Sequence, residues 1–400
     1  MNILFLNTYC GYFGGVEQNI ASAAEGLRSL GHHCTLVYTQ ETETRLDHYK
    51  SLFDQTLCAP TDDELTSTLE ELTEKGSWDA LYVHKLKSVA PLEPIKGTIR
   101  MVRMIHDHDE CCPRHHKYFV CPNRICNYAV GLKCWADLAF IERDRQAKLG
   151  VRFNNLFQHK KELVRNRELF DAYLVGSLFM HDELLINGFD SDQVQCLAPC
   201  VKHPDRKPTP VPDTHEILYV GQLIKGKGVD LLLQALTYVT EPFHLTIAGS
   251  GNAEGALKAL TQDLDLEAQV DFSGWIAPEE LDRLYDQCRI LAVPSRWAEP
   301  FGMIGLEAMQ RARPVVGFDV GGIPDWLETG VTGYAVPEAD VQQFADALNR
   351  LLYDHKTAQQ FGAQGRKKLE AEFSFETYLE QLSTVLKAPQ EQGTSNPWKK

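Results

Sequence analysis

Short apolar runs alternate with amphipathic stretches along most of the 400-residue chain. This alternation is typical of βα units, in which buried parallel strands are followed by helices. In the first half the pattern predicts strands at 2–7, 34–38, 80–84, 99–105 and 172–175, and helices at 17–30, 64–74 and 178–187.

A proline-rich segment, residues 202–214, divides this pattern. It contains four prolines and no periodic apolar residues, which is typical of an interdomain linker. After it the alternation restarts, with expected strands at 217–220, 245–248, 270–272, 290–293 and 314–317, and expected helices at 229–238, 254–262, 279–288, 302–311, 323–328, 341–354, 356–372 and 376–387.

The length suits two domains of about 200 residues each. We therefore predict an α/β chain with two Rossmann-like domains, at 1–201 and 215–372. Ligands are expected at the carboxyl ends of the strands and in a crevice between the domains.

The charge balance excludes a typical nucleic-acid binder, because the formal net charge is −15 and such proteins present a basic face. No stretch approaches the run of about 18 apolar residues that a transmembrane helix needs. The apolar start, residues 1–6, has no basic region or cleavage site and is interpreted as a strand rather than a signal peptide. We expect a cytoplasmic protein, with peripheral membrane contact left open.

The strongest local signal is residues 295–310, which follow an expected buried strand. Pro300 fits the first position of a helix, and the amides of Phe301, Gly302 and Met303 would then form an anion site at the helix N-terminus.

Two glutamates flank this turn. Glu299 precedes the expected helix, and Glu307 lies in an apolar stretch where a bare carboxylate is costly unless it is hydrogen-bonded. Alternatively, Glu299 only complements the helix dipole, worth about 0.3–1 kcal/mol, and Glu307 faces solvent. Two acids around one anion-binding turn suit a ligand with hydroxyls on both sides of a phosphate.

Glu299-Pro-Phe-Gly-x4-Glu307 resembles the E-x7-E signature of retaining glycosyltransferases of family 4, which have the GT-B fold. Tyr219-Val-Gly-Gln-Leu-x3-Lys227-Gly228, Ile247-Ala-Gly-Ser-Gly251, residues 272–274 and residues 321–325 resemble other loops of that family. The resemblance implies two Rossmann-like domains facing each other across a crevice, with a helix at 373–388 crossing back to the N-terminal domain and a tail at 389–400.

The resemblance also implies roles in binding a nucleotide-sugar donor. Glu299 would bind the sugar hydroxyls, Glu307 the ribose hydroxyls, and the amides of 301–303 the sugar and phosphate. Lys227 would neutralise the diphosphate, which leaves with growing negative charge. An ordinary solvated lysine is the alternative, although a helix start disfavours a cation.

Gln222 departs from the family, which usually has Arg at this position. Glutamine carries no charge, and Lys225 would replace the arginine only as a point charge without its fork. We expect Gln222 in place of arginine to affect the turnover rate more than the class of reaction.

Two further loops complete the expected donor site. Gly251 belongs to the second of the resembling loops, and Ile276 to a loop that would help distinguish UDP from GDP. Gly14 and Gly15 open a helix after the first strand, so the backbone there can approach a phosphate closely. In the family this loop contacts the donor diphosphate or the acceptor. The alternative is a tight turn with no role in ligand binding.

His106 follows the expected strand 99–105 and begins the run His106-Asp107-His108-Asp109. The run alone suits a metal site or a polar turn. The resemblance matches His106 to a histidine at the catalytic crevice, where front-face attack uses no protein nucleophile, so we assign it positioning and electrostatics. The family implies no catalytic metal and no cofactor beyond the sugar-nucleotide substrate.

Five of the eleven cysteines lie within residues 111–134. A structural zinc held by Cys112, Cys121, Cys126 and Cys134, with His115 or His116, is one interpretation, although the spacings match no standard module. Free or redox-paired thiols are the other. We expect this insert to be an acceptor-side loop.

Residues 143–167 contain eight Lys or Arg and two acidic residues. The pattern fits a solvated helical face. It also fits docking to an anionic membrane or a lipid-linked acceptor, at roughly 1 kcal/mol per basic residue.

Together these features predict a retaining glycosyltransferase that moves a hexose-type sugar from a UDP- or GDP-sugar to a glycan or lipid-linked acceptor, in cell-surface polysaccharide or glycolipid biosynthesis. A GT-B isomerase or hydrolase of nucleotide sugars is one alternative, against which the Glu299/Glu307 pair argues. A non-catalytic nucleotide-sugar-binding subunit is another, motivated by Gln222.

Overall fold

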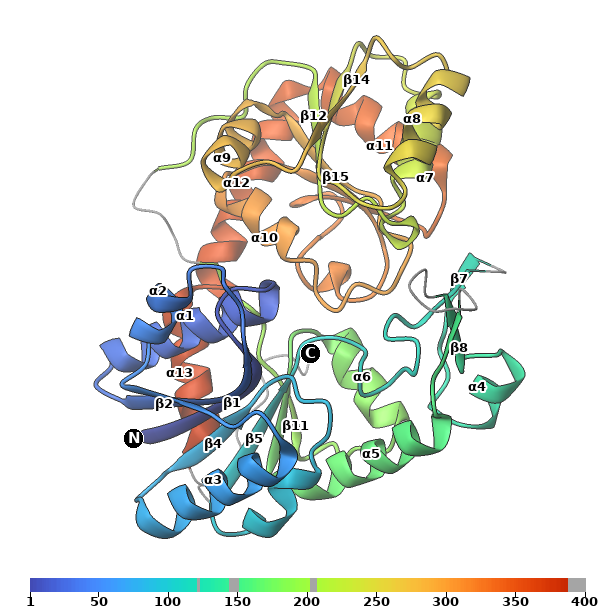
Figure 1. Cartoon of the computed structure of the whole chain (residues 1–400). Helices are drawn as coiled ribbons and strands as arrows, with labels where there is room; N and C mark the ends of the chain where they lie inside the picture. Colours follow the sequence, from blue (N-terminus) through green and yellow to red (C-terminus); the bar gives the residue numbers. More distant parts are fainter. Residues whose placement is uncertain (121–122, 144–150, 202–206, 388–400) are drawn as a thin grey trace. The chain divides into compact units, whose positions relative to one another are not determined.

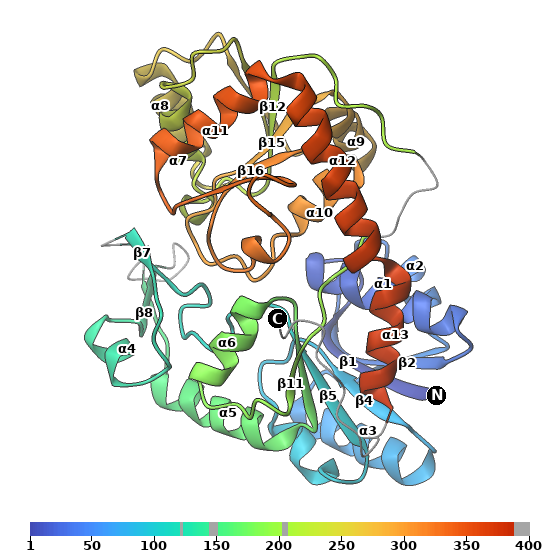
Figure 2. The ribbon, with the colours of Figure 1, turned by 180° about the vertical axis from the view of Figure 1, so that it is seen from behind.

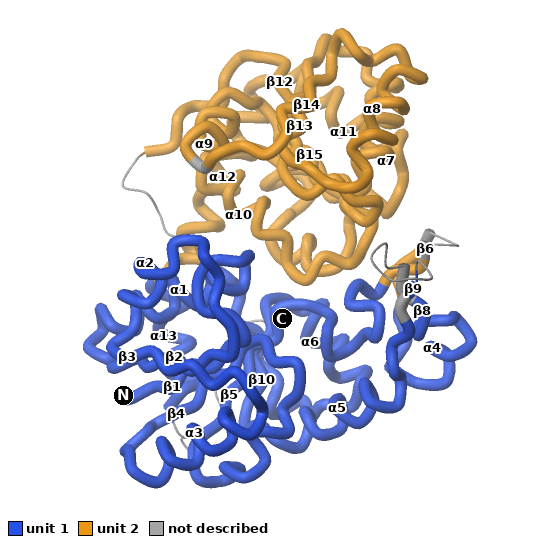
Figure 3. Tube along the Cα trace, viewed as in Figure 1, with its two compact units in different colours: residues 1–117, 127–199, 376–400 blue, residues 118–126, 200–375 orange. Residues whose placement is uncertain are grey.

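Two parallel β-sheets covered by helices organise the chain (Figures 1 and 2), which confirms the predicted α/β fold class. The computed structural model describes residues 1–120, 123–143, 151–201 and 207–387. Its contacts divide the chain into two compact units (Figure 3): unit 1 is Met1–Lys117, Asn127–Pro199 and Glu376–Lys400, of which residues 388–400 lie outside the described part, and unit 2 is Tyr118–Cys126 and Cys200–Phe375.

The sheet of unit 1 has seven strands in the order β11-β10-β5-β4-β1-β2-β3, all paired in parallel. The strands are β1 (Asn2–Cys10), β2 (His33–Glu41), β3 (Gln55–Cys58), β4 (Ala80–Val83), β5 (Arg100–Ile105), β10 (Ala172–Val175) and β11 (Val194–Cys196). The direction of winding changes between β1 and β4, so the loops after these two strands flank a topological switch point, where α/β sheets bind ligands.

Helices cover both faces of this sheet. The helices of unit 1 are α1 (Gly15–Ser29), α2 (Leu46–Ser51), α3 (Asp62–Lys75), η1 (Ala90–Ile95), α4 (Leu132–Ala136), α5 (Leu156–Leu169), α6 (Leu178–Ile186) and α13 (Phe375–Leu386), of which α4 lies away from the sheet beside β8 (Ile141–Arg143) (Figures 1 and 2). Leu4 and Leu6 join one core cluster with α3, η1, α5 and α6, whereas Phe5 packs against Tyr82 on the other face, with ring centroids 5.5 Å apart.

Helix α13 lies on the same side of this sheet as α1 (Figure 2). Arg100 Nε donates to the Val385 carbonyl over 2.9 Å, so the last described helix is tied to a strand of unit 1. Among the described residues, every helix is too short or too polar to cross a bilayer.

The sheet of unit 2 has six strands in the order β14-β13-β12-β15-β16-β17, again all parallel, with the switch point between β12 and β15. The strands are β12 (Glu216–Val220), β13 (His244–Ala248), β14 (Val270–Gly274), β15 (Ile290–Val293), β16 (Val315–Phe318) and β17 (Gly333–Val336). The helices are η2 (Lys225–Lys227), α7 (Val229–Leu236), α8 (Glu254–Asp263), α9 (Pro278–Gln287), α10 (Met303–Gln310), η3 (Ile323–Asp325), α11 (Val341–Tyr353) and α12 (His355–Glu372).

Some elements differ from the sequence prediction. The short strands β3, β11 and β17 and helix α5 were not predicted, and the expected helix at 323–328 is the short 3₁₀ helix η3, which contains a proline. Between α3 and α5 the chain also forms two antiparallel hairpins, β6 (Tyr118–Val120) with β7 (Asn123–Ile125) and β8 (Ile141–Arg143) with β9 (Val151–Phe153).

The boundaries of the units also differ from the predicted domains. Part of the cysteine-bearing insert groups with unit 2, and unit 2 begins again at Cys200 instead of 215. The first part of the predicted linker, residues 202–206, lies outside the described residues. Its remainder is held on unit 2, because Arg313 Nη1 donates to the Thr209 carbonyl over 3.1 Å and Val211 is buried.

Candidate functional site

The loops after β12, β13 and β14 enclose a cavity of about 460 Å³ in unit 2. Backbone hydrogen bonds join these loops: Gly221 to Ala248 (3.0 Å), Leu223 to Ser250 (2.9 Å) and Gly249 to Gly274 (2.7 Å). The predicted donor-binding residues Gln222, Gly251 and Ile276 all line the cavity. The exposed Trp275 lines it too and was missed, although its place directly after β14 was a signal.

Two glycines allow this close approach of backbones. A Cβ on Gly249, whose φ is +156°, would lie 1.8 Å from the Gly221 carbonyl oxygen, and one on Gly251 would lie 2.3 Å from the Leu223 carbonyl oxygen. A side chain does not fit at either position, so the floor of the cavity is backbone.

Lys227 and Glu299, predicted separately, form an ion pair. Lys227 Nζ lies 2.6 Å from Glu299 Oε1, and Ser295 Oγ donates to the same oxygen over 2.5 Å. Glu299 is buried, and Lys227 Nζ also lies 5.1 Å from the centroid of the Trp297 ring. Both residues flank the switch point, Lys227 after β12 and Glu299 after β15, and Ser295 is a contact that sequence alone did not show.

The turn before α10 differs from the prediction. Pro300 lies outside the helix, which begins at Met303, so the expectation that Pro300 opens it is wrong. The reason is Gly302, the N-cap, whose φ of +90° interrupts the helix. The Trp326 indole holds the turn by donating to the Phe301 carbonyl over 2.7 Å.

The amides at the start of α10 are available to a ligand. Within the part of the chain that the structure describes, the Met303 and Ile304 amides donate to no protein acceptor, whereas Gly305 donates to the Gly302 carbonyl over 3.0 Å. The Phe301 and Gly302 amides likewise donate to no backbone acceptor among the described residues. The predicted set 301–303 therefore stays a candidate anion site, which the Ile304 amide extends by one residue.

Glu307 lies about one turn into α10 and is half-buried. Tyr285 of α9 donates its hydroxyl to Glu307 Oε2 over 2.9 Å, and burial raises the pKa of the Glu307 carboxyl. Leu281, one turn before Tyr285, lines the cavity. A partly desolvated carboxylate with one donor can accept further hydrogen bonds from hydroxyl groups. Tyr285 had no signal in the sequence.

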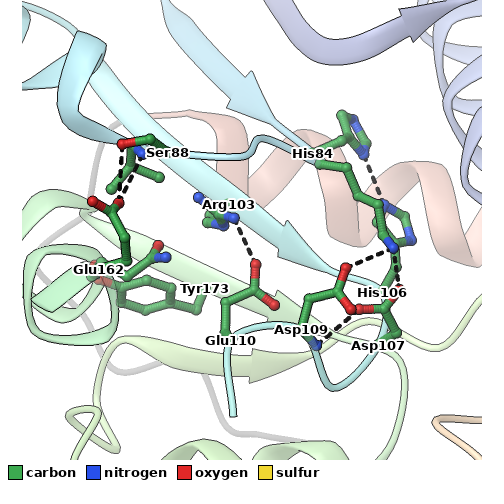
Figure 4. A network of polar contacts seen from close by, with 12 residues as sticks. His84, Ser88, Arg103, His106, Asp107, Asp109, Glu110, Glu162 and Tyr173 are labelled. Atoms are coloured by element: carbon green, nitrogen blue, oxygen red, sulfur yellow. Dashed lines mark hydrogen bonds and ion pairs between the residues drawn. The ribbon is translucent and has the colours of Figure 1, made fainter. Parts of the chain in front are cut away.

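In unit 1, His106 lies against a second histidine, His84 (Figure 4). His84 follows β4, His106 follows β5, and His84 Nδ1 lies 2.9 Å from His106 Nε2 with the rings stacked at 5.2 Å. Burial lowers the pKa of His106 to about 3 and lowers that of His84 as well. Both rings are therefore neutral near pH 7. His84 was missed, although it ends a predicted strand.

A charged group adjoins the histidines (Figure 4). Lys85 Nζ contacts the carboxylates of Asp107 and Asp109, the latter at 2.8 Å, and His115 Nδ1 lies 2.8 Å from Asp109. Burial, then the Asp109 charge, raises the pKa of Asp107 to about 6. The residues around His106 thus form an ion-pair network that offers both donors and acceptors.

The glycine-rich loop begins α1. Gly14 is its N-cap, and the Gly14 amide donates to Glu17 Oε2 over 2.9 Å. Asn7 connects this loop to the end of β4, since its Nδ2 donates to Glu17 (3.2 Å) and its Oδ1 accepts from the Lys85 amide (3.1 Å). Neither Gly14 nor Gly15 has a positive φ, and a Cβ on Gly15 would meet open space. The backbone itself therefore does not require glycine at these two positions.

The cysteine cluster shows no metal centre in its described part. Cys111 and Cys112 are buried free thiols and Cys134 is a half-buried one, whereas Cys121 lies outside the described residues. Among the described residues, no group of three or more His, Cys, Asp or Glu is arranged to hold a metal ion. The zinc interpretation stays a prediction.

A buried ion pair anchors the start of the insert. Lys117 Nζ lies 2.7 Å from Glu183 Oε2, and both side chains are almost fully buried. Removing one partner of such a pair is costly, because the other charge stays buried.

Two arginines of the basic segment 143–167 form ion pairs or hydrogen bonds with other residues of unit 1. Arg165 pairs with Glu93 and Glu162 at 2.5 Å each, and Arg167 donates to the Asn187 carbonyl over 3.1 Å. Lys160 and Lys161 are exposed on α5. Asp144, Arg145 and Lys148 lie outside the described residues, as do the side chains of Arg143 and Arg152.

The described contacts thus bring the predicted residues together in two groups. One, in unit 2, is the ion pair of Lys227 with Glu299. The cavity of the same unit is lined by the predicted Gln222, Gly251 and Ile276, whereas Lys227, Glu299 and Glu307 are not among the described residues that line it. The other, in unit 1, combines His106 with the strand ends beside the glycine-rich loop.

Residues 202–368 match the family model of glycosyl transferases group 1. The chain is 30% identical over 181 residues to an uncharacterized glycosyltransferase of Methanocaldococcus jannaschii, covering 45% of this chain and 46% of that one. It is 33% identical over 178 residues to the amylovoran biosynthesis glycosyltransferase AmsK of Erwinia amylovora, covering 42% and 44%. The similarity thus spans less than half the length of these curated relatives.

The likeness in structure extends over nearly the whole chain. The crystal structure of Anabaena HepE in complex with UDP and glucose matches with a TM-score of 0.71 at 16% identity, over 96% of this chain and 99% of that one. The chain therefore has the α/β fold of GT-B glycosyltransferases, and its residues 202–368 match glycosyl transferases group 1.

Proposed function

We propose that the protein is a retaining glycosyltransferase of family 4. It transfers a hexose-type sugar from a UDP- or GDP-sugar to a glycan or lipid-linked acceptor, in cell-surface polysaccharide or glycolipid biosynthesis in the cytoplasm. The observation that carries the proposal is the ion pair between the half-buried Lys227 and the buried Glu299. Lys227 follows the loop after β12, which lines a cavity of about 460 Å³. It lies in the segment that matches the glycosyl transferase model.

The cavity suits a nucleoside. Its volume is within the range of about 300–1,000 Å³ typical of small-molecule sites, and no charged side chain is among the described residues that line it. Trp275 and Ile276 offer apolar area for a base, and Glu307 offers acceptors for ribose hydroxyls. Anabaena HepE, of the same fold, was crystallised with UDP, which supports a uridine nucleotide as one candidate donor.

In the proposed reaction, the bond between the sugar anomeric carbon and the donor diphosphate breaks while the acceptor oxygen bonds to the same face of that carbon. The acceptor proton passes to the leaving diphosphate oxygen. Lys227 and the amides at the start of α10 stabilise the negative charge that grows on the diphosphate. Glu299 accepts hydrogen bonds from sugar hydroxyls once Lys227 turns toward phosphate.

His106 contributes positioning. Its ring is neutral, so it can orient a hydroxyl but does not supply a positive charge. The proposal includes no catalytic metal and no cofactor besides the nucleotide-sugar substrate.

A thermal-shift series with UDP, GDP and ADP tests the donor. A ligand at 100 times its dissociation constant adds about 2.7 kcal/mol of stability, so the correct base gives a clear shift. We expect UDP or GDP to stabilise unit 2 and ADP to have little effect. Equal shifts with all three, or none, would contradict the proposed donor site.

Nucleotide release in the presence and absence of glycan acceptors tests the reaction. A transferase releases nucleotide faster when its acceptor is added, and NMR of the product shows retention at the anomeric carbon. An isomerase or hydrolase turns over its donor without any acceptor, and a binding subunit shows a thermal shift without turnover.

A further inference from the structure

Unit 1 exposes large apolar side chains within one short stretch of chain. The exposed fractions are 88% for Leu132, 44% for Trp135, 54% for Leu138, 62% for Phe153 and 76% for Phe157. Single apolar residues on a surface are ordinary, but a cluster marks an interaction site.

These side chains gather where α4 meets the start of α5. The Trp135 ring lies 5.9 Å from the Phe157 ring and 5.2 Å from the Phe140 ring, so aromatic groups of both helices converge. Figures 1 and 2 show α4, β8 and the first turn of α5 next to one another. Leu132 and Trp135 are three residues apart on α4, which places them on one side of that helix.

The turn that ends α4 keeps a leucine on the surface. Leu138 has a φ of +53°, a conformation that favours glycine or asparagine after a helix. The Ala139 amide closes this turn by donating to the Cys134 carbonyl over 2.8 Å. A bulky apolar side chain is therefore exposed at a position where the backbone favours a small or polar residue.

Lysines border this apolar cluster. Lys160 and Lys161 lie three and four residues after Phe157, on the same face of α5. Both are exposed and have no ion pair among the described residues, whereas Arg165 one turn later is tied to Glu93 and Glu162. Lys160 and Lys161 line a hollow of about 580 Å³, in which four cations outnumber two glutamates; the other lining residues are Glu93, Lys96, Phe157, Val164, Arg165, Glu168 and Leu169.

The combination is unusual for this chain, whose net charge is −15. Aromatic and leucine side chains flanked by unpaired lysines are typical of surfaces that lie at a membrane interface, where rings enter the headgroup zone and amines approach phosphates. An acidic protein partner would satisfy the lysines, but it would leave the exposed leucines and rings without an apolar environment.

We propose that Leu132, Trp135, Leu138, Phe157, Lys160 and Lys161, the α4–α5 patch, dock the protein on a bilayer that contains anionic phospholipid. The proposal goes beyond the donor site and does not depend on it. It also gives a location for the membrane contact expected from residues 143–167. Arg165 and Arg167 are bound to other residues of unit 1, whereas the exposed Lys160 and Lys161 lie beside the aromatic rings of α4 and α5.

Vesicle co-sedimentation of the full chain without nucleotide tests this docking. We expect binding to vesicles of phosphatidylcholine with phosphatidylglycerol, weak binding to phosphatidylcholine alone, and loss of binding as salt rises. Lys160→Gln with Lys161→Gln is expected to lower the partition constant by roughly 30-fold at low salt. Trp135→Ser with Phe157→Ser is expected to abolish binding.

Matched variants control for general changes in charge and apolarity. Lys356→Gln with Lys367→Gln removes two exposed lysines of α12, and Tyr353→Ser removes an exposed ring that is 80% accessible; neither is expected to change binding. If the aromatic variant does not fold, the lysine variant alone decides. The absence of wild-type binding to anionic vesicles overturns the proposal, and so does binding that the patch variants leave unchanged. Thermal shifts with UDP and GDP on the same variants report the donor site separately.

Discussion

The two candidate sites, one in each unit, are built in different ways. In unit 2, backbone loops joined by hydrogen bonds form the cavity, and the reactive side chains come mainly from one contiguous motif, residues 295–307. In unit 1, side chains from the ends of separate strands meet: His84 with His106, and Lys85 with two aspartates.

The similarity to known proteins follows this difference. The glycosyl transferase model matches residues 202–368, within unit 2, whereas the structural likeness covers 96% of the chain. A backbone-built site limits which residues fit, since glycines at close approaches cannot change. A site built from side chains can change its residues while the strands keep their order.

The largest expected effect tests the candidate site in unit 2. Glu299→Gln keeps the size of the side chain but removes the charge that pairs with Lys227. We expect the rate of sugar transfer to fall roughly 1,000-fold, because hydrogen bonds to the sugar weaken in the transition state. The thermal shift with the free nucleotide should persist, since the cavity is intact.

Glu279→Gln on α9 is the matched control for this loss, because it removes an exposed glutamate of the same unit. Full activity of Glu299→Gln would show that the site assignment in unit 2 is wrong.

The next effect tests the candidate site in unit 1 through the pH dependence of stability. In the unfolded chain a histidine gains its proton near pH 6.5, whereas in the folded protein His106 does so at about pH 3. The unfolded state therefore binds more protons between these values, and stability falls as the pH drops from 6.5 toward 3. His84→Asn with His106→Gln should reduce that fall by roughly 5 kcal/mol.

Urea unfolding at neutral and acidic pH measures this slope, and hydrogen exchange of β4 and β5 assigns it to unit 1. His215→Asn, an exposed histidine of unit 2, is the control. A slope that stays the same in the double variant would contradict the picture of two neutral, buried rings.

A smaller effect tests whether backbone builds the cavity. Gly249→Ala places a Cβ 1.8 Å from the Gly221 carbonyl oxygen at a φ of +156°. We expect a loss of about 2–3 kcal/mol in the stability of unit 2, with weaker nucleotide binding. Gly255→Ala in α8, where a Cβ meets open space, should instead stabilise by about 0.5–1 kcal/mol. Equal effects of the two substitutions would show that the loops do not depend on their close approach.

The smallest effect sharpens the role of charge in unit 2. Gln222→Arg adds a cation at the edge of the cavity, at the position where the resembling family has Arg. We expect kcat/KM to rise by up to about 10-fold, because a guanidinium can bind a diphosphate with two hydrogen bonds. Gln234→Arg on the exposed side of α7 should leave it unchanged. A fall in kcat/KM for Gln222→Arg would show that the cavity needs a neutral residue there.

Local periodicity determined most of the fold. Apolar runs predicted β10 and β15 with their exact bounds and most other strands to within a few residues, because buried parallel strands are apolar along their whole length. The four-residue strand β3 was not predicted, because Gln55–Cys58 is partly polar and becomes a strand only by pairing with β2.

The sequence by itself determined the two-unit α/β plan and the motif that contains Glu299 and Glu307, because both are written in contiguous residues. Only the tertiary structure decided what these groups touch: Lys227 and Ser295 on Glu299, Tyr285 on Glu307, and His84 on His106. The physical reason is that a hydrogen bond depends on tenths of an ångström and on burial, and both are set by strand register and helix packing between residues far apart in the chain.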